Sequence, residues 1–307
     1  MILHVSSASD RFWPVLRALS LHALVWSGWA AFIPTITIFA VTRRTAAWPS
    51  LDPSTGQLIL TPAVNGVLLI IGQITSLALF LLAWHFLERK SLRGMLLDRL
   101  SGAWRPFLLG ILSALATIVT VGLLMMASGA VHLTLRAGGA TGHASLAGVC
   151  FILAAALIGP FTEEIESRGY LFQAVSRGWG GPTAVIATAI VFAARHLQNP
   201  HASAIGIVNI VLISIAITLG MIFLRSLWYA IGWHVAWNSS LIFLFGSANS
   251  GFSPQAFGIS GISLFSSSLT GSDIVTGGAF GMEGSIVVTG VLALEIVFLW
   301  RIRARSA

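Results

Sequence analysis

The chain has 307 residues, of which 56% are hydrophobic and only 9% are charged. Soluble domains carry about 25% charged residues, so this composition excludes an ordinary soluble domain. The formal net charge of +7 would suit a nucleic-acid partner, but the arginines stand between apolar segments, where membrane topology explains them better. We therefore expect a multi-pass protein of the cell membrane, with lipids as partners and no nucleic acid.

Apolar segments long enough to cross a bilayer recur along the whole chain. A spanning helix needs about 20 mainly apolar residues. Residues 1–14 contain Asp10 and lack an apolar core, so no cleavable signal peptide is expected. By that length criterion we expect about eight spans, over residues 15–41, 63–86, 107–127, a fourth from 144, 182–196, 204–224, 227–245 and 285–300. The predicted fold class is an all-α polytopic transmembrane helix bundle, with residues 1–307 as one integral membrane domain.

Lysine and arginine residues orient the predicted bundle, because cytoplasmic loops collect them. The connection after the second span contains Arg89, Lys90, Arg93, Arg99 and Arg105, and the chain ends with Arg301, Arg303 and Arg305. An even number of spans then places both termini in the cytoplasm, with Arg43 and Arg44 as the main exception. The connection 246–284 contains no lysine or arginine and is expected to be external. Its glycine and serine content predicts a flexible or loosely packed loop.

Three polar clusters interrupt the predicted spans, each on its own apolar segment. They are Glu163-Glu164-x-x-x-Arg168, Phe192-x-x-x-His196 and His234-x-x-x-Asn238. Residues four apart share a helix face, so Glu164 can pair with Arg168, while Glu163 points about 100° away from Glu164. Ionisable groups at membrane depth are costly and usually functional, so these clusters form the candidate site.

The depth of the candidate site follows from counting residues along the predicted helices. The fourth and fifth spans form a hairpin that turns at 178–181. Glu163 lies about 15 residues before this turn and His196 about 15 residues after it, so both lie roughly 22 Å from the turn. His234 lies only about 8 residues, or roughly 12 Å, inside its own span. These levels agree if the turn protrudes into the cytoplasm, which predicts a site in the inner half of the bilayer.

The residue types in the three clusters suit hydrolysis. A carboxylate beside a histidine in a poorly hydrated cavity can hold and deprotonate a water molecule. A second histidine and an asparagine on one helix face can donate hydrogen bonds to the oxyanion of a tetrahedral intermediate. Alternatively, Glu163, His196 and His234 can bind Zn2+, which accepts two histidines and a carboxylate with water in the open position. The residues leave a glutamate–water mechanism and a metal mechanism both open.

The three motifs, in this order and on separate hydrophobic segments, resemble the CPBP (Abi) intramembrane protease family. That family includes type II CAAX prenyl endopeptidases and proteins linked to bacteriocin processing and self-immunity. The resemblance covers residues 147–245 and implies a catalytic core there. It also implies that Glu163 activates water with His196, and that His234 and Asn238 stabilise the oxyanion or bind a metal.

The first motif has two further positions and one departure from the family pattern. Glu164 and Arg168 match the remaining motif positions, and the resemblance implies that they shape the site. Glu166-Ser167 departs from the pattern, because an apolar or aromatic residue commonly precedes the arginine. An added acid near the site is expected to alter either its protonation or its contact with the substrate.

Three functions are compatible with these features. The first is an intramembrane endopeptidase that hydrolyses peptide bonds of a membrane-associated protein or peptide on the cytoplasmic side. The second is a non-catalytic member of the same family that acts in bacteriocin self-immunity or as a membrane scaffold. The third is a small proton-coupled transporter that uses the buried carboxylates as a relay. The complete set of motif residues favours the first function, and the lack of recognisable inverted halves argues against the third.

Overall fold

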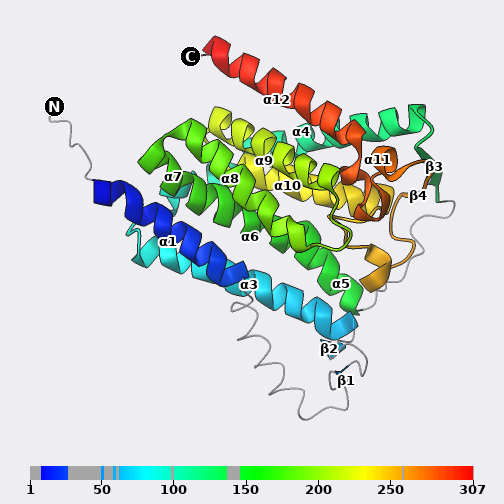
Figure 1. Ribbon diagram of the computed structural model, residues 1–307, viewed down its shortest axis with the longest axis horizontal. Coiled ribbons are helices and arrows are strands. Elements are labelled where there is room, and N and C mark those ends of the chain that lie inside the picture. Colours follow the sequence, from blue (N-terminus) through cyan, green and yellow to red (C-terminus); the bar gives the residue numbers. More distant parts are fainter. Residues whose placement is uncertain are drawn as a thin grey trace.

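The computed structural model describes residues 8–26, 50–51, 58–59, 62–97, 100–136, 146–257 and 259–306, which form a bundle of helices (Figure 1). The helices are α1 (Ala8–Trp26), α3 (Pro62–Phe86), α4 (Leu100–Ala127), α5 (Leu146–Ile152), α6 (Gly159–Glu164), α7 (Phe172–Trp179), α8 (Gly181–Arg195), α9 (Ala204–Leu224), α10 (Leu227–Ser239), α11 (Asp273–Thr276) and α12 (Ile286–Ser306). The strands are β1 (Ser50–Leu51), β2 (Leu58–Ile59), β3 (Val131–Leu135) and β4 (Phe265–Leu269). The chain is thus mostly helical, as predicted, with two small antiparallel pairs, β1–β2 and β3–β4, that an all-α fold lacks.

Four helical segments are long and apolar enough to cross a membrane: Leu69–Phe86, Ser101–Ala127, Gly148–Trp179 and Ala204–Leu224. A shorter apolar helix covers Phe12–Val25. Helices α8, α10 and α12 lie where the fifth, seventh and eighth spans were predicted. The first predicted span, 15–41, begins within α1, and its remainder lies outside the described residues.

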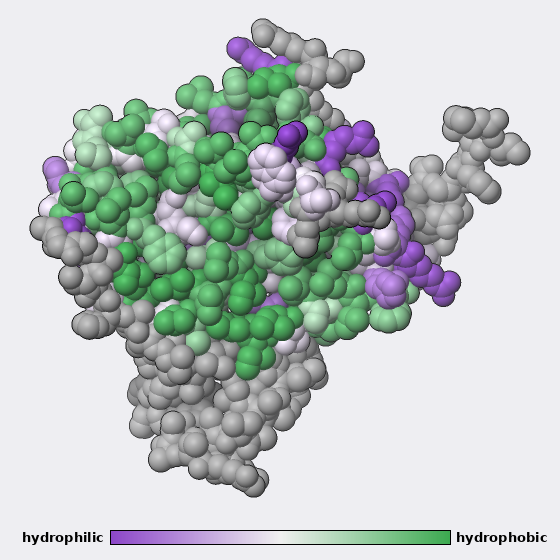
Figure 2. All heavy atoms as spheres, turned by 180° about the vertical axis from the view of Figure 1, so that it is seen from behind, coloured by the Kyte–Doolittle hydropathy of each residue, from purple (hydrophilic) through white to green (hydrophobic). Residues whose placement is uncertain are grey.

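Large apolar side chains are exposed over much of the bundle surface. Leu112, Leu123 and Leu294 are 52%, 60% and 73% exposed, respectively. Figure 2 shows apolar residues over most of the visible described surface, with hydrophilic residues gathered mainly toward one edge. Soluble proteins rarely expose apolar patches of this extent, whereas lipid tails cover them. The four apolar helices and this surface indicate a membrane protein.

One end of the bundle is rich in basic residues, and we call it the basic end. There Glu88, just after α3, accepts a hydrogen bond from Arg17 of α1 at 3.0 Å and lies 3.8 Å from Arg177 of α7. Tyr170 also donates its hydroxyl to Glu88 at 3.1 Å. Helix α1 begins and α12 ends at this side of the bundle, where α7 turns into α8 (Figure 1). The described ends of the chain therefore lie on the same side as the basic connections.

Helix α10, which carries the third motif, packs against α4, α6 and α9. Its contact with α4 depends on glycine. A Cβ atom on Gly110 of α4 would lie 2.2 Å from the carbonyl oxygen of Tyr229, and one on Gly232 of α10 would lie 2.2 Å from that of Phe107. Small residues allow helix backbones to approach closely in membranes, where the hydrophobic effect does not drive helix association. The glycines thus hold the third motif at the centre of the bundle.

The helical segment from α5 to α7 carries the first motif and departs from regular α-helix twice. Its π-helical stretches are Leu153–Ile158 and Ile165–Leu171, and a third π-helical stretch, Ser240–Phe245, extends α10. Turns of this kind are rare and often occur at functional sites, because they change which side chains share a face. The second stretch begins directly after Glu164, and the third begins two residues after Asn238. The irregular turns therefore flank the motif residues.

Residues 246–257 and 259–285, which we call the cap, cover the end of the bundle opposite the basic end (Figure 1). The cap contains β4, which pairs with β3 from Val131↔Leu269 to Leu135↔Phe265. Phe280, Met282 and Glu283 are only 0–1% exposed. These residues of the cap are packed against the bundle, which differs from the sequence-based expectation of a loosely packed loop, whereas residues 268–274 are exposed.

Glycine and polar side chains explain how a segment of this composition packs. Gly281 has a φ of 103°, and a Cβ atom there would lie 2.4 Å from the carbonyl oxygen of Ala248. Asn209 of α9 donates its amide to the carbonyl oxygens of Glu283 at 2.7 Å and Ser285 at 2.8 Å. Left-handed glycines permit tight turns, and the amide satisfies buried backbone acceptors. The glycine and serine content that suggested a flexible loop therefore allows tight turns and buried hydrogen bonds.

The buried carboxyl group of Glu283 predicts a pH-dependent stability. Burial raises its pKa from 4.5 to about 7, although Ser250 donates its hydroxyl to Oε1 at 2.6 Å and His234 lies close enough for attraction. A carboxyl group with a raised folded-state pKa contributes stability below pH 4.5 and loses it as the pH rises to about 7. Relative to Glu283→Gln, the free energy of unfolding of the wild type should fall by on the order of 2–3 kcal/mol over this window. Denaturant unfolding of both proteins in detergent at about pH 5 and pH 8 measures the change, and an equal difference at both pH values would contradict it.

Candidate active site

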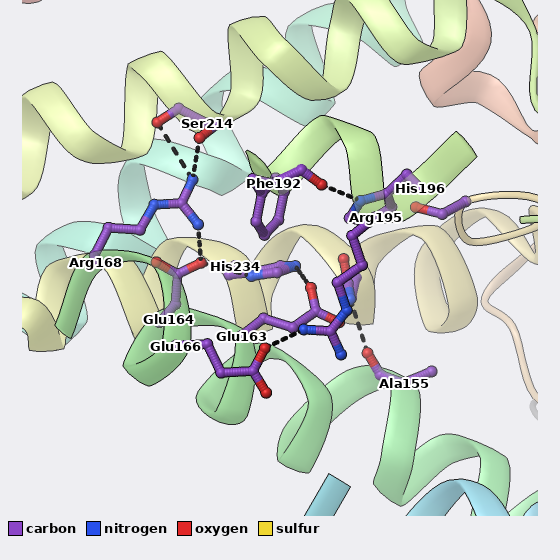
Figure 3. Close-up of polar contacts among 12 residues, drawn as sticks. Ala155, Glu163, Glu164, Glu166, Arg168, Phe192, Arg195, His196, Ser214 and His234 are labelled. Carbon is purple, nitrogen blue, oxygen red and sulfur yellow. Dashed lines mark hydrogen bonds and ion pairs between the residues drawn. The ribbon is translucent and has the colours of Figure 1, made fainter. Parts of the chain in front are cut away.

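A pocket with a volume of about 240 Å³ lies inside the bundle between α3, the α5–α6 segment, the end of α8, α10 and the cap. The four residues predicted to be catalytic all line it: Glu163, His196, His234 and Asn238. Figure 3 shows Glu163 and His234 facing one another, with His196 on the neighbouring helix end. Three motifs separated in the sequence thus meet at one cavity.

The pocket lies next to the cap. Asn199, which follows α8, and Ser250 of the cap both line it. Glu163 lies midway along the 32-residue segment Gly148–Trp179, whereas α8 has only 15 residues and ends directly before His196. The site is therefore at the end of α8 that is farther from the basic end. The 15 residues of α8 agree with the counted distance between the 178–181 turn and His196, and the depth of the site in the bilayer stays a prediction.

Glu163 lines the pocket from α6, and its side chain is 16% exposed. Its Oε2 atom lies 3.9 Å from Nε2 of His234. This distance is too long for a direct hydrogen bond, but one water molecule can contact both groups at once. The carboxylate is thus placed to bind a water molecule next to an imidazole.

Glu164 turns the other way and holds His234 in position. Its Oε1 atom accepts a hydrogen bond from Nη1 of Arg168 at 2.9 Å, which is the pairing that their spacing predicted. The same oxygen lies 2.9 Å from Nδ1 of His234. Because a carboxylate only accepts, Nδ1 carries the hydrogen, and Nε2 is left facing Glu163. Glu164 therefore orients the histidine as well as pairing with the arginine.

Arg168 is completely buried and has several partners besides Glu164. Its Nη2 atom donates to Oγ of Ser214 at 2.7 Å and to the carbonyl oxygen of the same residue at 3.3 Å, and Nε donates to Thr218 at 3.3 Å. The guanidinium lies 4.4 Å from the centre of the Phe192 ring. These contacts join α9 and α8 to the helix that carries the first motif.

His196 and Asn238 are both held by backbone carbonyl groups. Nδ1 of His196 donates to the carbonyl oxygen of Phe192 at 2.8 Å, which leaves Nε2 as the free nitrogen. The Phe192 ring lies 4.9 Å from the His196 ring and 5.9 Å from the His234 ring, so it contacts both imidazoles. Asn238 donates its amide to the carbonyl oxygen of Ala155 at 2.8 Å and keeps a second N–H. Each side chain therefore has a fixed orientation, and each keeps one group for the substrate: Nε2 of His196 and the second N–H of Asn238.

Two charged residues of the site were not assigned a role from the sequence. Oε2 of Glu166 forms an ion pair with Nη1 of Arg195, and its Oε1 accepts a hydrogen bond from Ser76 of α3. Arg195 also lines the pocket. The departure of Glu166 from the family pattern was the available signal, whereas no motif pointed to Arg195. Asn199 and Ser250 were missed because they come from connections that carry no motif.

The proposed zinc ligands share the pocket but do not form a metal-binding group. Among the described residues, no set of three or more His, Cys, Asp or Glu side chains is arranged to hold a metal ion. Glu163, His196 and His234 belong to the residues that were searched. The glutamate–water mechanism and the zinc alternative both stay predictions, and no step below passes through a metal.

The segment that forms the site also matches a known protein family. Residues 144–240, about a third of the chain, match the family described as type II CAAX prenyl endopeptidase Rce1-like. Members of that family are intramembrane proteases. No curated protein and no solved structure matches the chain. The matched segment holds all three motifs, which confirms the resemblance that the motifs indicated.

Proposed function

We propose that the protein is an intramembrane endopeptidase that hydrolyses a peptide bond of a membrane-associated protein or peptide. The observation that carries the proposal is the arrangement of Glu163 and the two histidines around one pocket. Both histidines use Nδ1 for a structural hydrogen bond, so each has Nε2 left for chemistry. The match to a family of intramembrane proteases supports the same reaction.

Each residue has a separate role in the proposed reaction. Glu163 takes a proton from a water molecule that Nε2 of His196 helps to orient, and the water oxygen attacks the carbonyl carbon of the substrate. The resulting oxyanion receives hydrogen bonds from the spare N–H of Asn238 and, when Nε2 of His234 carries a proton, from that nitrogen. Glu163 then gives its proton to the leaving nitrogen, the C–N bond breaks, and a carboxyl and an amino terminus are released.

We further propose that the protein crosses the membrane about eight times, with both termini in the cytoplasm. The basic residues near the α3–α4 connection, the α7–α8 turn and the chain end support this orientation, because such residues collect on the cytoplasmic side. The cap is then external, and the pocket opens toward the outer half of the bilayer. Cleavage on the outer side replaces the sequence-based expectation of cleavage on the cytoplasmic side.

The proposal is tested with purified protein in liposomes, mixed with a panel of membrane-anchored peptides in oxygen-18 water. We expect cleavage at a defined bond, with one oxygen-18 atom in the new carboxyl terminus of each product, because the attacking oxygen comes from water. Mass spectrometry of the fragments measures both the bond and the label. Folded wild-type protein that leaves every peptide intact would contradict the proposal and favour a non-catalytic family member.

A chelator arm of the same assay separates the two mechanisms. Because Glu163 activates water directly in the proposed reaction, we expect the cleavage rate to change by less than about twofold after treatment with a metal chelator. Loss of activity that added zinc restores would instead assign Glu163, His196 and His234 as metal ligands.

A further inference from the structure

Glu166 and Arg195, whose side chain is 23% exposed, form a partly buried connection between three helices beside the pocket. Glu166 lies in the π-helical stretch after α6, and its side chain is 1% exposed. It pairs with Arg195, the last residue of α8, and accepts a hydrogen bond from Ser76 of α3, which is 2% exposed. The connection therefore joins α3, the helix that carries the first motif, and the end of α8.

The position of this pair along the chain connects it to the reacting groups. Glu166 follows Glu163 by three residues in the same helical segment, and Arg195 directly precedes His196. An ion pair between Glu166 and Arg195 thus fixes the backbone that carries His196 relative to the backbone that carries Glu163. Glu166 lies where the family pattern has an apolar or aromatic residue, so this link is a feature of this chain rather than of the motif.

The charges around the pocket give the pair a second effect. The two guanidinium groups described beside the motif residues are each paired, Arg168 with Glu164 and Arg195 with Glu166, and the carboxyl group of Glu283 is bonded to Ser250. The carboxylate of Glu163, in contrast, faces the imidazole of His234. Arg195 lies close enough to Glu163 for electrostatic attraction. Without Glu166, Glu163 would be the carboxylate nearest to an unpaired arginine.

We propose that Glu166 and Arg195 are positioning residues for the reaction of this site: Arg195 fixes His196, and Glu166 prevents Arg195 from pairing with Glu163. The inference rests on the proposed function. It differs from a purely structural cross-link in one respect, because it predicts that removing one partner harms catalysis more than removing both. Breaking a buried pair leaves an uncompensated charge, whereas removing both charges does not.

The test is a double-mutant cycle with Glu166→Gln, Arg195→Gln and the double variant, measured on a cleaved peptide. We expect Glu166→Gln to lower kcat by at least about tenfold while KM stays within about threefold, because Arg195 then engages Glu163. Arg195→Gln should also lower kcat, because Glu166 is left unpaired near Glu163. The double variant should recover about threefold or more of the kcat lost in Glu166→Gln, because no charge is left unpaired. Arg195→Lys, which keeps the charge, should retain more activity than Arg195→Gln.

A matched control separates positioning from stability. Glu88→Gln breaks ion pairs of a buried glutamate with the partly exposed Arg17 and Arg177 at the basic end, away from the pocket. It should lower the unfolding temperature but leave kcat per folded molecule and the pH profile of kcat unchanged. The pH profile of Glu166→Gln should differ from that of the wild type, and the profile of the double variant should return toward it.

Two results would overturn the positioning proposal while the proposed function stands. One is a set of single variants that keep wild-type kcat per folded molecule. The other is a double variant whose loss of kcat equals or exceeds the loss in Glu166→Gln alone. A wild-type protein that cleaves no peptide gives a different result, since it contradicts the proposed function and the positioning proposal together.

Discussion

Replacing Glu163 with glutamine should lower kcat by about 10²–10⁴-fold while the protein stays folded. Glutamine has the same shape but accepts no proton from water at neutral pH, so the attacking hydroxide is no longer generated. The side chain is 16% exposed to the pocket and lies 3.9 Å from His234, beyond hydrogen-bonding distance. The substitution therefore removes chemistry without breaking a direct contact to His234. Initial rates of peptide cleavage and the unfolding temperature of the same preparation measure the two effects.

Glu295→Gln is the matched control for this substitution. Glu295 is a partly buried acid of α12 that accepts hydrogen bonds from Thr117 at 2.9 Å and Ser113 at 3.2 Å, and it does not line the pocket. The two hydroxyls bond different carboxylate oxygens; in glutamine the amide oxygen accepts from one hydroxyl and the amide nitrogen donates to the other. The variant should therefore keep kcat within about threefold of the wild type. If both variants lost kcat equally, the loss would follow from replacing any buried carboxylate, and Glu163 would not be the catalytic base.

Arg168→Met should destabilise the protein by about 3–5 kcal/mol, because it leaves the carboxylate of Glu164 buried without its cation. Arg168 and Glu164 are both fully buried, and Arg168 also holds Ser214 and Thr218 of α9. Activity should fall together with stability, because Glu164 orients His234. Denaturant unfolding in detergent, followed by helix content, measures the loss of free energy.

Arg177→Met in α7 is the control that separates this pair from an ordinary ion pair. Arg177 is 34% exposed and lies 3.8 Å from Glu88, and exposed pairs contribute about 0–1 kcal/mol. The double variant Glu164→Gln/Arg168→Met should recover part of the lost stability, because the unpaired charge is gone. If Arg168→Met and Arg177→Met lower the free energy of unfolding equally, the account of Arg168 as the partner of a buried carboxylate is wrong.

Continuous apolar runs made the main helices predictable. The segment 204–224 was predicted from hydropathy, and α9 has the same bounds. The pairing of Glu164 with Arg168 followed from their four-residue spacing and is present at 2.9 Å. Both predictions depend on local periodicity, which the sequence displays directly.

Features that depend on contacts between distant segments could not be predicted in the same way. The π-helical stretch Ile165–Leu171 leaves no mark on hydropathy. The ion pair of Glu166 with Arg195 joins residues 29 positions apart on different helices, and neither partner predicts the other. The packed part of the cap was not predicted because glycine and serine serve both flexible loops and tight turns, and only tertiary contacts such as those of Asn209 distinguish the two.

The most direct test of the central claim compares three proteins in one assay: the wild type, Glu163→Ala and His196→Ala, each reconstituted with the same membrane-anchored peptide. The account predicts cleavage at one bond by the wild type and rates at least about 10²-fold lower for both variants, with all three proteins folded to the same extent. Equal cleavage by the three proteins would contradict it, because Glu163 and His196 would then not carry the hydrolysis.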